Sequence, residues 1–180
     1  MSTPVSIHAF LEDARVPYTV VPHPTNLSAQ MDATGRSMPA RGWAKVVICV
    51  ADGEPIQAVL PAPLIVNLDW LSALAGASFI RFALKEESRT WFPDCEPGAM
   101  PPLGPLYGQR VFVDSALATE FEVVFNAGTH RHAIRMRYTD LAAVTQPTIG
   151  RFAEMPEQPR HETVGRTANW RAIFRGTSRE

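Results

Sequence analysis

The chain has 180 residues, of which 46% are hydrophobic, and its formal net charge is −1. This length fits one domain with a core of ordinary size, and the near-neutral charge excludes the broad basic surface of proteins that bind nucleic acid along its length. The two cysteines are too few for a disulfide scaffold. The N-terminal sequence lacks a basic region followed by an apolar run, and no apolar stretch is long enough to cross a bilayer. We therefore expect a cytoplasmic protein without membrane contact.

The first predicted elements are a helix, a strand and a second short helix. Thr3 and Pro4 suit the cap and first turn of a helix, and apolar residues then recur at helical spacing up to Arg15. Residues 18–21 are predicted to form a short strand, which the prolines that follow would end. Residues 28–34 would form a brief helix closed by a glycine.

A hairpin is predicted next. Residues 43–50 are rich in β-branched and aromatic side chains, a pattern typical of a strand buried on both faces. Asp52 and Gly53 are typical of a tight hairpin turn. Residues 57–60 should therefore return antiparallel to the first strand.

Short helices and strands are predicted around one long loop in the rest of the chain. Asn67 or Asp69 can cap a helix that ends at Gly76, and Asp114 is expected to cap the turn after its strand. Residues 92–105 are so dense in proline and glycine that no regular element is expected, and loops of this length are usually functional or disordered. The other predicted elements are strands over residues 79–83, 110–114, 122–125 and 132–137, helices over residues 85–91 and 139–144, and a turn over residues 126–129.

Strands with interspersed helices, but without regular βαβ alternation, favour an α+β fold: a mixed, largely antiparallel sheet or barrel with flanking short helices. The folded domain is expected over residues 1–148. Residues 149–180 are mostly polar and without periodicity, which predicts a mobile tail. Within this tail, Trp170, Ile173 and Phe174 fall at helical spacing, so its end could dock as a short amphipathic helix.

Lys45 is the most informative residue because it lies inside the apolar strand predicted over residues 43–50. Moving an ammonium group out of water costs on the order of several kcal/mol, so the side chain must either reach an opening or bind something anionic or carbonyl-like. A structural alternative is that it extends its charged head to the end of the strand. The only other lysine, Lys85, lies in a polar segment typical of a solvated helix face.

Several short motifs follow one another in an order that resembles a known family. The lysine that opens an apolar strand is followed by Gly-Ala-Met-Pro-Pro-Leu-Gly at residues 98–104 and by Asn-Ala-Gly-Thr-His at residues 126–130. In this order the motifs resemble the YbaK/ProX family of aminoacyl-tRNA deacylases, over residues 5–145 or so. Members of that family are editing domains that hydrolyse the ester joining a wrong amino acid to tRNA, often tRNA(Pro).

The resemblance implies that the strand lysine and the glycine-proline loop form the active site. The catalytic residues would be Lys45, Gly98, Ala99 and Met100. Backbone N–H groups of Ala99 or Met100 would stabilise the tetrahedral oxyanion, and Lys45 would supply positive charge toward the terminal phosphate, the ester carbonyl or the oxyanion. The residues assigned to substrate binding are His23, Pro101, Pro102, Gly104, Gly128, Thr129 and His130.

The histidines and one cysteine have alternative roles. His130 could orient a water, contact the terminal adenosine, bind the amino acid or simply face solvent in a turn. Together with His132 and His23 it could form a metal site, but the spacing fixes neither a carboxylate nor a third ligand, so we expect no metal and no cofactor. Cys95 lies in the loop, but a thiol nucleophile needs a base that the sequence does not place beside it.

The main functional hypothesis is a metal-independent hydrolase that edits mischarged tRNA, with a small amino acid on tRNA(Pro) as the expected substrate. Pocket volume would select the small amino acid, because overpacking excludes a larger cognate residue. The expected partner is the acceptor end of an aminoacyl-tRNA, with specificity supplied by a synthetase partner or by the acceptor stem alone. The alternatives are a non-catalytic module that binds a ligand or partner in the same pocket and a metal-dependent hydrolase that uses His130 and His132.

Overall fold

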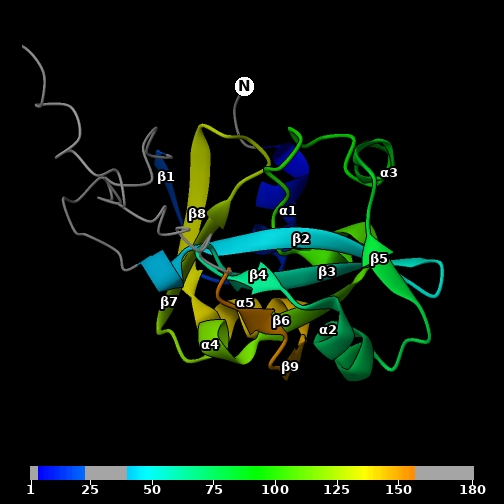
Figure 1. Ribbon diagram of the computed structural model, residues 1–180. Helices are drawn as coiled ribbons and strands as arrows, with labels where there is room; N and C mark the ends of the chain where they lie inside the picture. The colour runs from blue at the N-terminus through cyan, green and yellow to red at the C-terminus, as the bar shows by residue number, and fades with distance from the viewer. Residues whose placement is uncertain (1–3, 23–39, 157–180) are drawn as a thin grey trace, which may run out of the picture.

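The computed structural model describes residues 4–22 and 40–156 (Figure 1). None of the helices in these ranges is both long and apolar enough to cross a membrane. The helices are α1 (Val5–Asp13), α2 (Leu68–Ala75), α3 (Lys85–Trp91), α4 (Ser115–Ala118) and α5 (Tyr138–Thr145), with 3-10 turns η1 (Ala40–Gly42) and η2 (Gly104–Tyr107). The strands are β1 (Thr19–Pro22), β2 (Ala44–Ala51), β3 (Glu54–Pro61), β4 (Ile65–Val66), β5 (Ile80–Phe82), β6 (Arg110–Asp114), β7 (Glu122–Asn126), β8 (His132–Arg137), β9 (Thr148–Gly150) and β10 (Ala153–Glu154).

The strands form two main sheets and a small ribbon. The larger sheet has the order β5-β2-β3-β6-β9 and the smaller one the order β1-β8-β7, while β10 pairs with β4. Most neighbours run antiparallel, but β3 with β6 and β6 with β9 are parallel. A parallel bridge between Trp43 and Val124 joins the two main sheets. The larger sheet is mixed and the smaller one is antiparallel, and the described strands do not close into a barrel. The predicted α+β class with a mixed, largely antiparallel sheet is confirmed.

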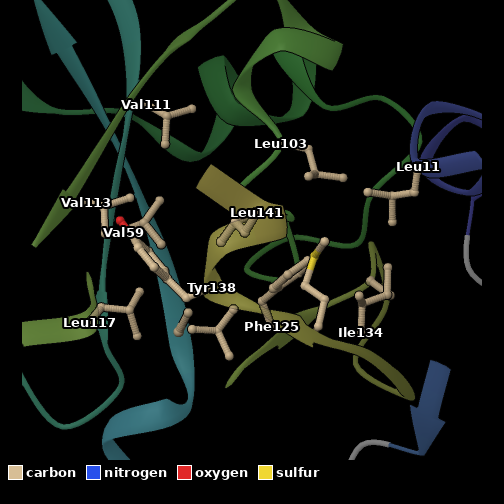
Figure 2. Packing of buried hydrophobic residues seen from close by; sticks show 14 of the residues in the cluster. Leu11, Val59, Leu103, Val111, Val113, Leu117, Phe125, Ile134, Tyr138 and Leu141 are labelled. Carbon is tan, nitrogen blue, oxygen red and sulfur yellow. The ribbon is translucent and has the colours of Figure 1, made fainter. Parts of the chain in front are cut away.

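Hydrophobic clusters lie on both faces of the larger sheet because successive side chains of a strand point to opposite faces. On one face Val59 belongs to a cluster with Leu11 of α1 and Ile134 of β8 (Figure 2). On the other face Leu60 packs in a cluster with α2 and Phe152. Apolar burial on both sides therefore holds β2 and β3 in the centre of the molecule.

The predicted hairpin and the helix after it form as expected. β2 and β3 pair antiparallel along their whole length around Asp52 and Gly53, both of which have positive φ. The Asn67 side chain accepts a hydrogen bond from the Trp70 N–H at 3.1 Å and so caps α2. Gly76 ends the helix in the left-handed conformation, which glycine adopts without a steric penalty.

Several boundaries differ from the prediction. Residues 92–105, here called the proline loop, run into the 3-10 turn η2 although no regular element is predicted there; Pro105 in its first turn already has a φ suited to this geometry. α1 ends before Arg15. α5 begins one residue before Thr139, which therefore does not cap it, because buried Tyr138 is its first helical residue.

Two further strands follow α5 that the sequence does not predict. β9 lies parallel to β6, and β10 pairs with β4. The Asp114 carboxylate accepts hydrogen bonds from the N–H groups of Phe152 and Ala153, each at 2.8 Å. The boundary expected after residue 148 falls within β9, so the first residues of the expected tail belong to the folded body. The predicted docking helix at the C-terminus and the helix predicted over residues 28–34 lie outside the described residues.

Candidate functional site

The proline loop lies against the turn formed by residues 126–130, although the two are far apart in the sequence. The Glu96 N–H donates to the Gly128 carbonyl oxygen at 2.8 Å, and the Gly128 N–H donates to the Ala99 carbonyl oxygen at 3.0 Å. Reciprocal backbone hydrogen bonds of this kind fix the relative position of two segments. The structure thus brings together the two motifs that the sequence analysis assigned to the site.

Asn126 connects this turn to the loop through its side chain. Its Nδ2 donates to the Gly98 carbonyl oxygen at 3.4 Å. Because a carbonyl oxygen can only accept, the nitrogen of the Asn126 amide faces Gly98 and Oδ1 faces away from it. Oδ1 is buried and has no hydrogen-bond partner among the described residues. A buried acceptor without a donor costs free energy, so Oδ1 is suited to a donor that a ligand brings. The sequence analysis treated Asn126 only as a turn residue and missed this role.

His130 holds the proline loop from the side of the turn. Its backbone N–H donates to the Glu96 carboxylate at 2.8 Å, and its Nε2–H donates to the Pro97 carbonyl oxygen at 2.8 Å. Since a carbonyl can only accept, Nε2 carries the proton and is not available as a base. The ring also lies over Gly98, where a Cβ would be 3.6 Å from its Cε1 atom. The contacts therefore give His130 a positioning role.

The backbone amides of the loop differ in their availability as donors. Ala99 is fully buried and its N–H donates to the Glu96 carbonyl oxygen at 2.9 Å, so the expectation that this amide binds an oxyanion is wrong. Within the described part of the chain, the N–H groups of Gly98 and Met100 have no acceptor. Gly98 is exposed and has a φ of +84°, a conformation that favours glycine. Gly98 and Met100 are therefore the donors that remain open to a ligand.

Other residues assigned to substrate binding are buried and have packing roles. A Cβ on Gly104 would lie 2.4 Å from the Gln109 carbonyl oxygen, and one on Gly128 would lie 2.6 Å from the Pro4 Cδ atom. Glycine is required at both positions because the neighbouring chain approaches closely. The remaining buried members of the predicted set are Pro101, Pro102 and Thr129. For Gly104 in particular, the structure explains the residue without a substrate contact.

Lys45 lies near the start of β2, the strand that contacts β7 of the smaller sheet. Trp43 and Val124 form the parallel bridge between the sheets and share a hydrophobic cluster. Because side chains alternate along a strand, Lys45 has the same orientation on its strand as Trp43, and Asn126 has the same orientation on β7 as Val124. Lys45 and the two residues after it are half-buried, so the side chain is not fully enclosed.

The charge of Lys45 has no counterpart nearby. Among the described residues the ammonium group makes no hydrogen bond or ion pair. Burial lowers the pKa of Lys45 from its usual value, because a partly desolvated ammonium is less stable than a solvated one. An unpaired cation of this kind favours an anionic or carbonyl-like ligand.

A pocket of about 430 Å³ opens between α3 and the proline loop. Gly98 and Met100 line it from the loop, and Lys85 and Arg89 line it from α3. Lys45 is not among the described residues that line it. Lys85 is exposed on α3, as predicted for a solvated helix face, and the fold in addition places it in the lining of this pocket.

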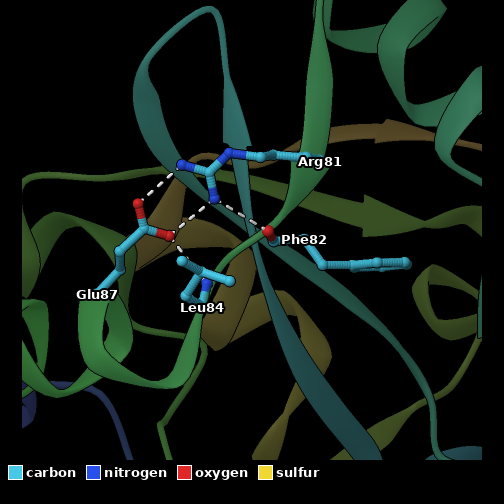
Figure 3. A network of polar contacts seen from close by, with 4 residues as sticks. All are labelled: Arg81, Phe82, Leu84 and Glu87. Carbon is cyan, nitrogen blue, oxygen red and sulfur yellow. Dashed lines mark hydrogen bonds and ion pairs between the residues drawn. The ribbon is translucent and has the colours of Figure 1, made fainter.

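An ion pair fixes the start of α3 against β5 (Figure 3). The Glu87 carboxylate accepts two hydrogen bonds from the Arg81 guanidinium, at 2.7 and 2.8 Å, and a third from the Leu84 N–H at 2.8 Å. The hydrogen bonds from Arg81, more than any other contact, lower the pKa of Glu87 to about 2. Arg81 also donates to the Phe82 carbonyl oxygen at 3.2 Å, so the pair ties the pocket helix to the sheet.

Two other chemical hypotheses gain no support from the described residues. Burial raises the pKa of Cys95 to about 11, and its Sγ lies 3.3 Å from the Tyr107 hydroxyl, so the thiol stays protonated near neutral pH. No group of three His, Cys, Asp or Glu side chains within residues 4–22 and 40–156 is placed to hold a metal ion. His132 Nδ1 lies 3.4 Å from the Thr129 hydroxyl, and His23 lies outside the described residues.

Comparison with protein families identifies the kind of domain that carries this site. A model of the aminoacyl-tRNA editing domain matches residues 23–144, more than half of the chain. The chain belongs to the aminoacyl-tRNA editing domain family. The matched segment contains Lys45, the proline loop and the turn at residues 126–130, so the resemblance to the YbaK/ProX family is confirmed. No curated protein sequence matches the chain significantly.

Solved structures share the fold of this editing domain. A crystal structure of a candidate trans-editing enzyme for prolyl-tRNA synthetase is 22% identical with a TM-score of 0.68, over 85% of this chain and 99% of that one. A protein from work on computational grafting of epitopes onto scaffolds is 17% identical with a TM-score of 0.73, over 87% and 99% of the two chains. A hypothetical protein is 16% identical with a TM-score of 0.70, over 83% and 99%. At such low sequence identities, the structural similarity establishes a shared fold.

Proposed function

We propose that this editing domain is an aminoacyl-tRNA deacylase that acts in trans on the ester of a mischarged tRNA. One observation carries the proposal: the turn at residues 126–130 holds the proline loop so that the amides of Gly98 and Met100 have no acceptor in the described chain. The strand of Lys45 contacts β7, the strand that leads into that turn. An aminoacyl ester is already activated, so fixed donors and a placed water suffice for its hydrolysis.

The reaction proposed for this site is a direct attack of water. The water oxygen adds to the ester carbonyl carbon, and the oxyanion that forms accepts hydrogen bonds from the open amides of Gly98 and Met100. The bond from this carbon to the ribose oxygen then breaks, and one proton of the water passes to that ribose oxygen, which leaves as a hydroxyl group while the amino acid leaves as its carboxylic acid. Lys45 would stabilise the developing negative charge. Loss of one such donor typically raises the barrier by about 3 to 4 kcal/mol.

The proposed substrate is a small amino acid on tRNA(Pro). The solved relative that is 22% identical is a candidate trans-editing enzyme for prolyl-tRNA synthetase, which favours this class of tRNA. The α-ammonium group of an aminoacyl ester is a donor that the buried Oδ1 of Asn126 could bind. The partner would be the acceptor end of the tRNA, with a synthetase or the acceptor stem adding specificity, and the reaction would take place in the cytoplasm.

A panel of charged tRNAs tests the proposal. Wild-type protein and Lys45→Ala are incubated with Ala-tRNA(Pro), Cys-tRNA(Pro), Ser-tRNA(Ala) and Pro-tRNA(Pro) at equal concentration, and remaining ester is measured. We expect one mischarged species to be cleared, Pro-tRNA(Pro) to be spared, and Lys45→Ala to be slower by about 10²- to 10³-fold. Arg110→Ala is the matched control, because it removes an exposed strand cation from β6, whereas Lys85 lines the pocket.

Two outcomes would refute parts of this proposal. If no species is cleared even at high protein concentration, hydrolysis of these substrates is ruled out and a non-catalytic binding module of the same fold becomes the better hypothesis. If exhaustive chelation abolishes clearance, the metal-independent mechanism is wrong. Activity that survives chelation would instead exclude a metal-dependent hydrolase.

A further inference from the structure

One face of α3 presents two positive charges to the pocket beside the proline loop. Lys85, Ser88 and Arg89 are three and four residues apart, which places them on one side of the helix, and all three line the pocket. Lys85 and Arg89 are exposed, and neither forms an ion pair with any described residue. The pocket thus offers a ligand two uncompensated cations and one hydroxyl group.

Carboxylates are absent from the described lining of this pocket. Glu87 is on the same helix, but its carboxylate lies 2.7 Å from Arg81 and is neutralised there. Glu86, also on this helix, is exposed but is not among the lining residues, so the charged residues that line the pocket in the described chain are both positive. A cleft lined by charges of one sign concentrates ligands of the opposite sign, so this pocket favours an anion.

The size and the walls of the pocket suit a nucleotide. Its volume of about 430 Å³ falls within the range of roughly 300 to 1,000 Å³ that is usual for small-ligand sites. Ala83, Phe92 and Met100 supply apolar surface against which a ribose or a base can pack. Gly98 and Met100 belong to both the pocket and the proposed catalytic loop, so a ligand in the pocket is continuous with the site of hydrolysis.

The chemistry of the substrate decides which anion belongs there. The carboxyl group of an aminoacyl ester is esterified and uncharged, and its amino group is cationic, so two unpaired cations would repel the amino acid. The RNA strand that carries it has one negative charge per phosphodiester. We infer that the pocket binds the phosphodiesters that immediately precede the terminal nucleotide of the tRNA 3′ strand, with Lys85 and Arg89 as the phosphate contacts. This inference rests on the proposed function for the identity of the RNA.

Binding of an uncharged acceptor minihelix ending in CCA tests the inference without catalysis. The double variant Lys85→Ala/Arg89→Ala should bind the minihelix about ten-fold more weakly than wild type, and the slope of log K against log salt should fall by about 0.7 for each lost phosphate contact. The charge-conserving variant Lys85→Arg/Arg89→Lys should bind as wild type does. Arg137→Ala/Arg151→Ala is the matched control, because it removes two exposed cations that do not line this pocket.

Kinetics separate this pocket from the catalytic residues. On aminoacyl-tRNA, Lys85→Ala/Arg89→Ala should raise KM about ten-fold with kcat unchanged, and it should hydrolyse 3′-O-aminoacyl-adenosine, which has no phosphodiester, at the wild-type rate. Equal weakening by the control pair, unchanged minihelix binding, or loss of activity on the adenosine ester would each overturn the inference. If wild type hydrolyses neither ester, the proposed function fails, and the minihelix comparison still decides whether the pocket binds RNA phosphates.

Discussion

Lys45 differs from an ordinary lysine because it is partly buried and has no partner among the described residues. Burial lowers its pKa, so in the intermediate pH range the folded state binds this proton less tightly than the unfolded state does. The ammonium therefore destabilises the fold at neutral pH, and this penalty is lost as the pH rises from the folded pKa to the higher unfolded pKa. A charged group kept at a cost to stability is typical of a functional site.

Asn126 is expected to contribute more to catalysis than to stability. Asn126→Ala should lower kcat/KM for the mischarged tRNA by about 10- to 100-fold, because the change removes both the donor to the Gly98 carbonyl and the buried acceptor Oδ1. The free energy of unfolding in urea should change by less than about 1 kcal/mol, because the substitution also removes Oδ1, a buried acceptor that has no partner in the described chain. Steady-state deacylation kinetics measure kcat/KM, and urea titration measures the free energy of unfolding.

Thr139→Ala is the control for this change, since the side chain is exposed on α5 and far in sequence from the loop. A large loss of stability in Asn126→Ala would show that the amide is needed for the fold. Unchanged kinetics would show that Oδ1 has no part in substrate binding.

Among the elements, the proline loop and the turn at residues 126–130 behave as one unit. Prolines restrict φ along the loop and supply no N–H donors. The hydrogen bonds between the loop and the turn involve Glu96 and Gly98 on the loop and Asn126, Gly128 and His130 on the turn, among others. Opposite this unit, α3 has only two turns and no fully buried side chain. Its position therefore depends on the Arg81–Glu87 pair as well as on packing.

The contribution of the Arg81–Glu87 pair to stability should depend on pH. Because the folded pKa of Glu87 is lowered to about 2, its ion pair contributes stability above the unfolded pKa of about 4.3 and loses it as the pH falls toward 2. Wild type should therefore resist urea slightly better than Glu87→Gln at pH 7, and the two midpoints should converge near pH 2. Since the carboxylate is exposed, the difference should be small. A difference that persists at pH 2 would contradict this account.

At the scale of the whole molecule, Asp114 joins the last strands to the larger sheet. Its carboxylate is buried and accepts three backbone hydrogen bonds, from Ala116 at 2.9 Å and from Phe152 and Ala153 at 2.8 Å each. One side chain thus caps α4 and holds the segment that leads into β10. The cap was predicted from the sequence, whereas the contact with residues 152 and 153 was not.

Asp114→Ala should destabilise the protein by about 3 kcal/mol, because each buried N–H left without an acceptor costs about 1 to 3 kcal/mol. Asp114→Asn keeps one acceptor oxygen, so its free energy of unfolding should fall by less than that of Asp114→Ala. Urea unfolding at pH 7 measures both. Asp69→Ala is the control, since Asp69 is exposed on α2; an equal loss in this control would show that the bridging role of Asp114 is not the cause.

The local features of this protein could be predicted from its amino-acid pattern. Alternation of apolar residues predicted β2 and β3, Asn67 and Gly76 predicted the ends of α2, and the order of motifs indicated the editing family. These features follow from backbone preferences and side-chain periodicity, which act over a few residues and can be recognised without a fold.

The hydrogen bonds and the pocket of the candidate site depend on the three-dimensional fold. It occupies the amide of Ala99 and the Nε2 atom of His130, leaves Oδ1 of Asn126 without a described donor, and turns Lys85 toward the loop. It also adds β9 and β10 to the sheets from a segment too short for a clear period. Each of these outcomes depends on partners that are distant in the chain. A hydrogen bond or a pocket exists only where packing brings such partners together, and no local pattern records which ones will meet.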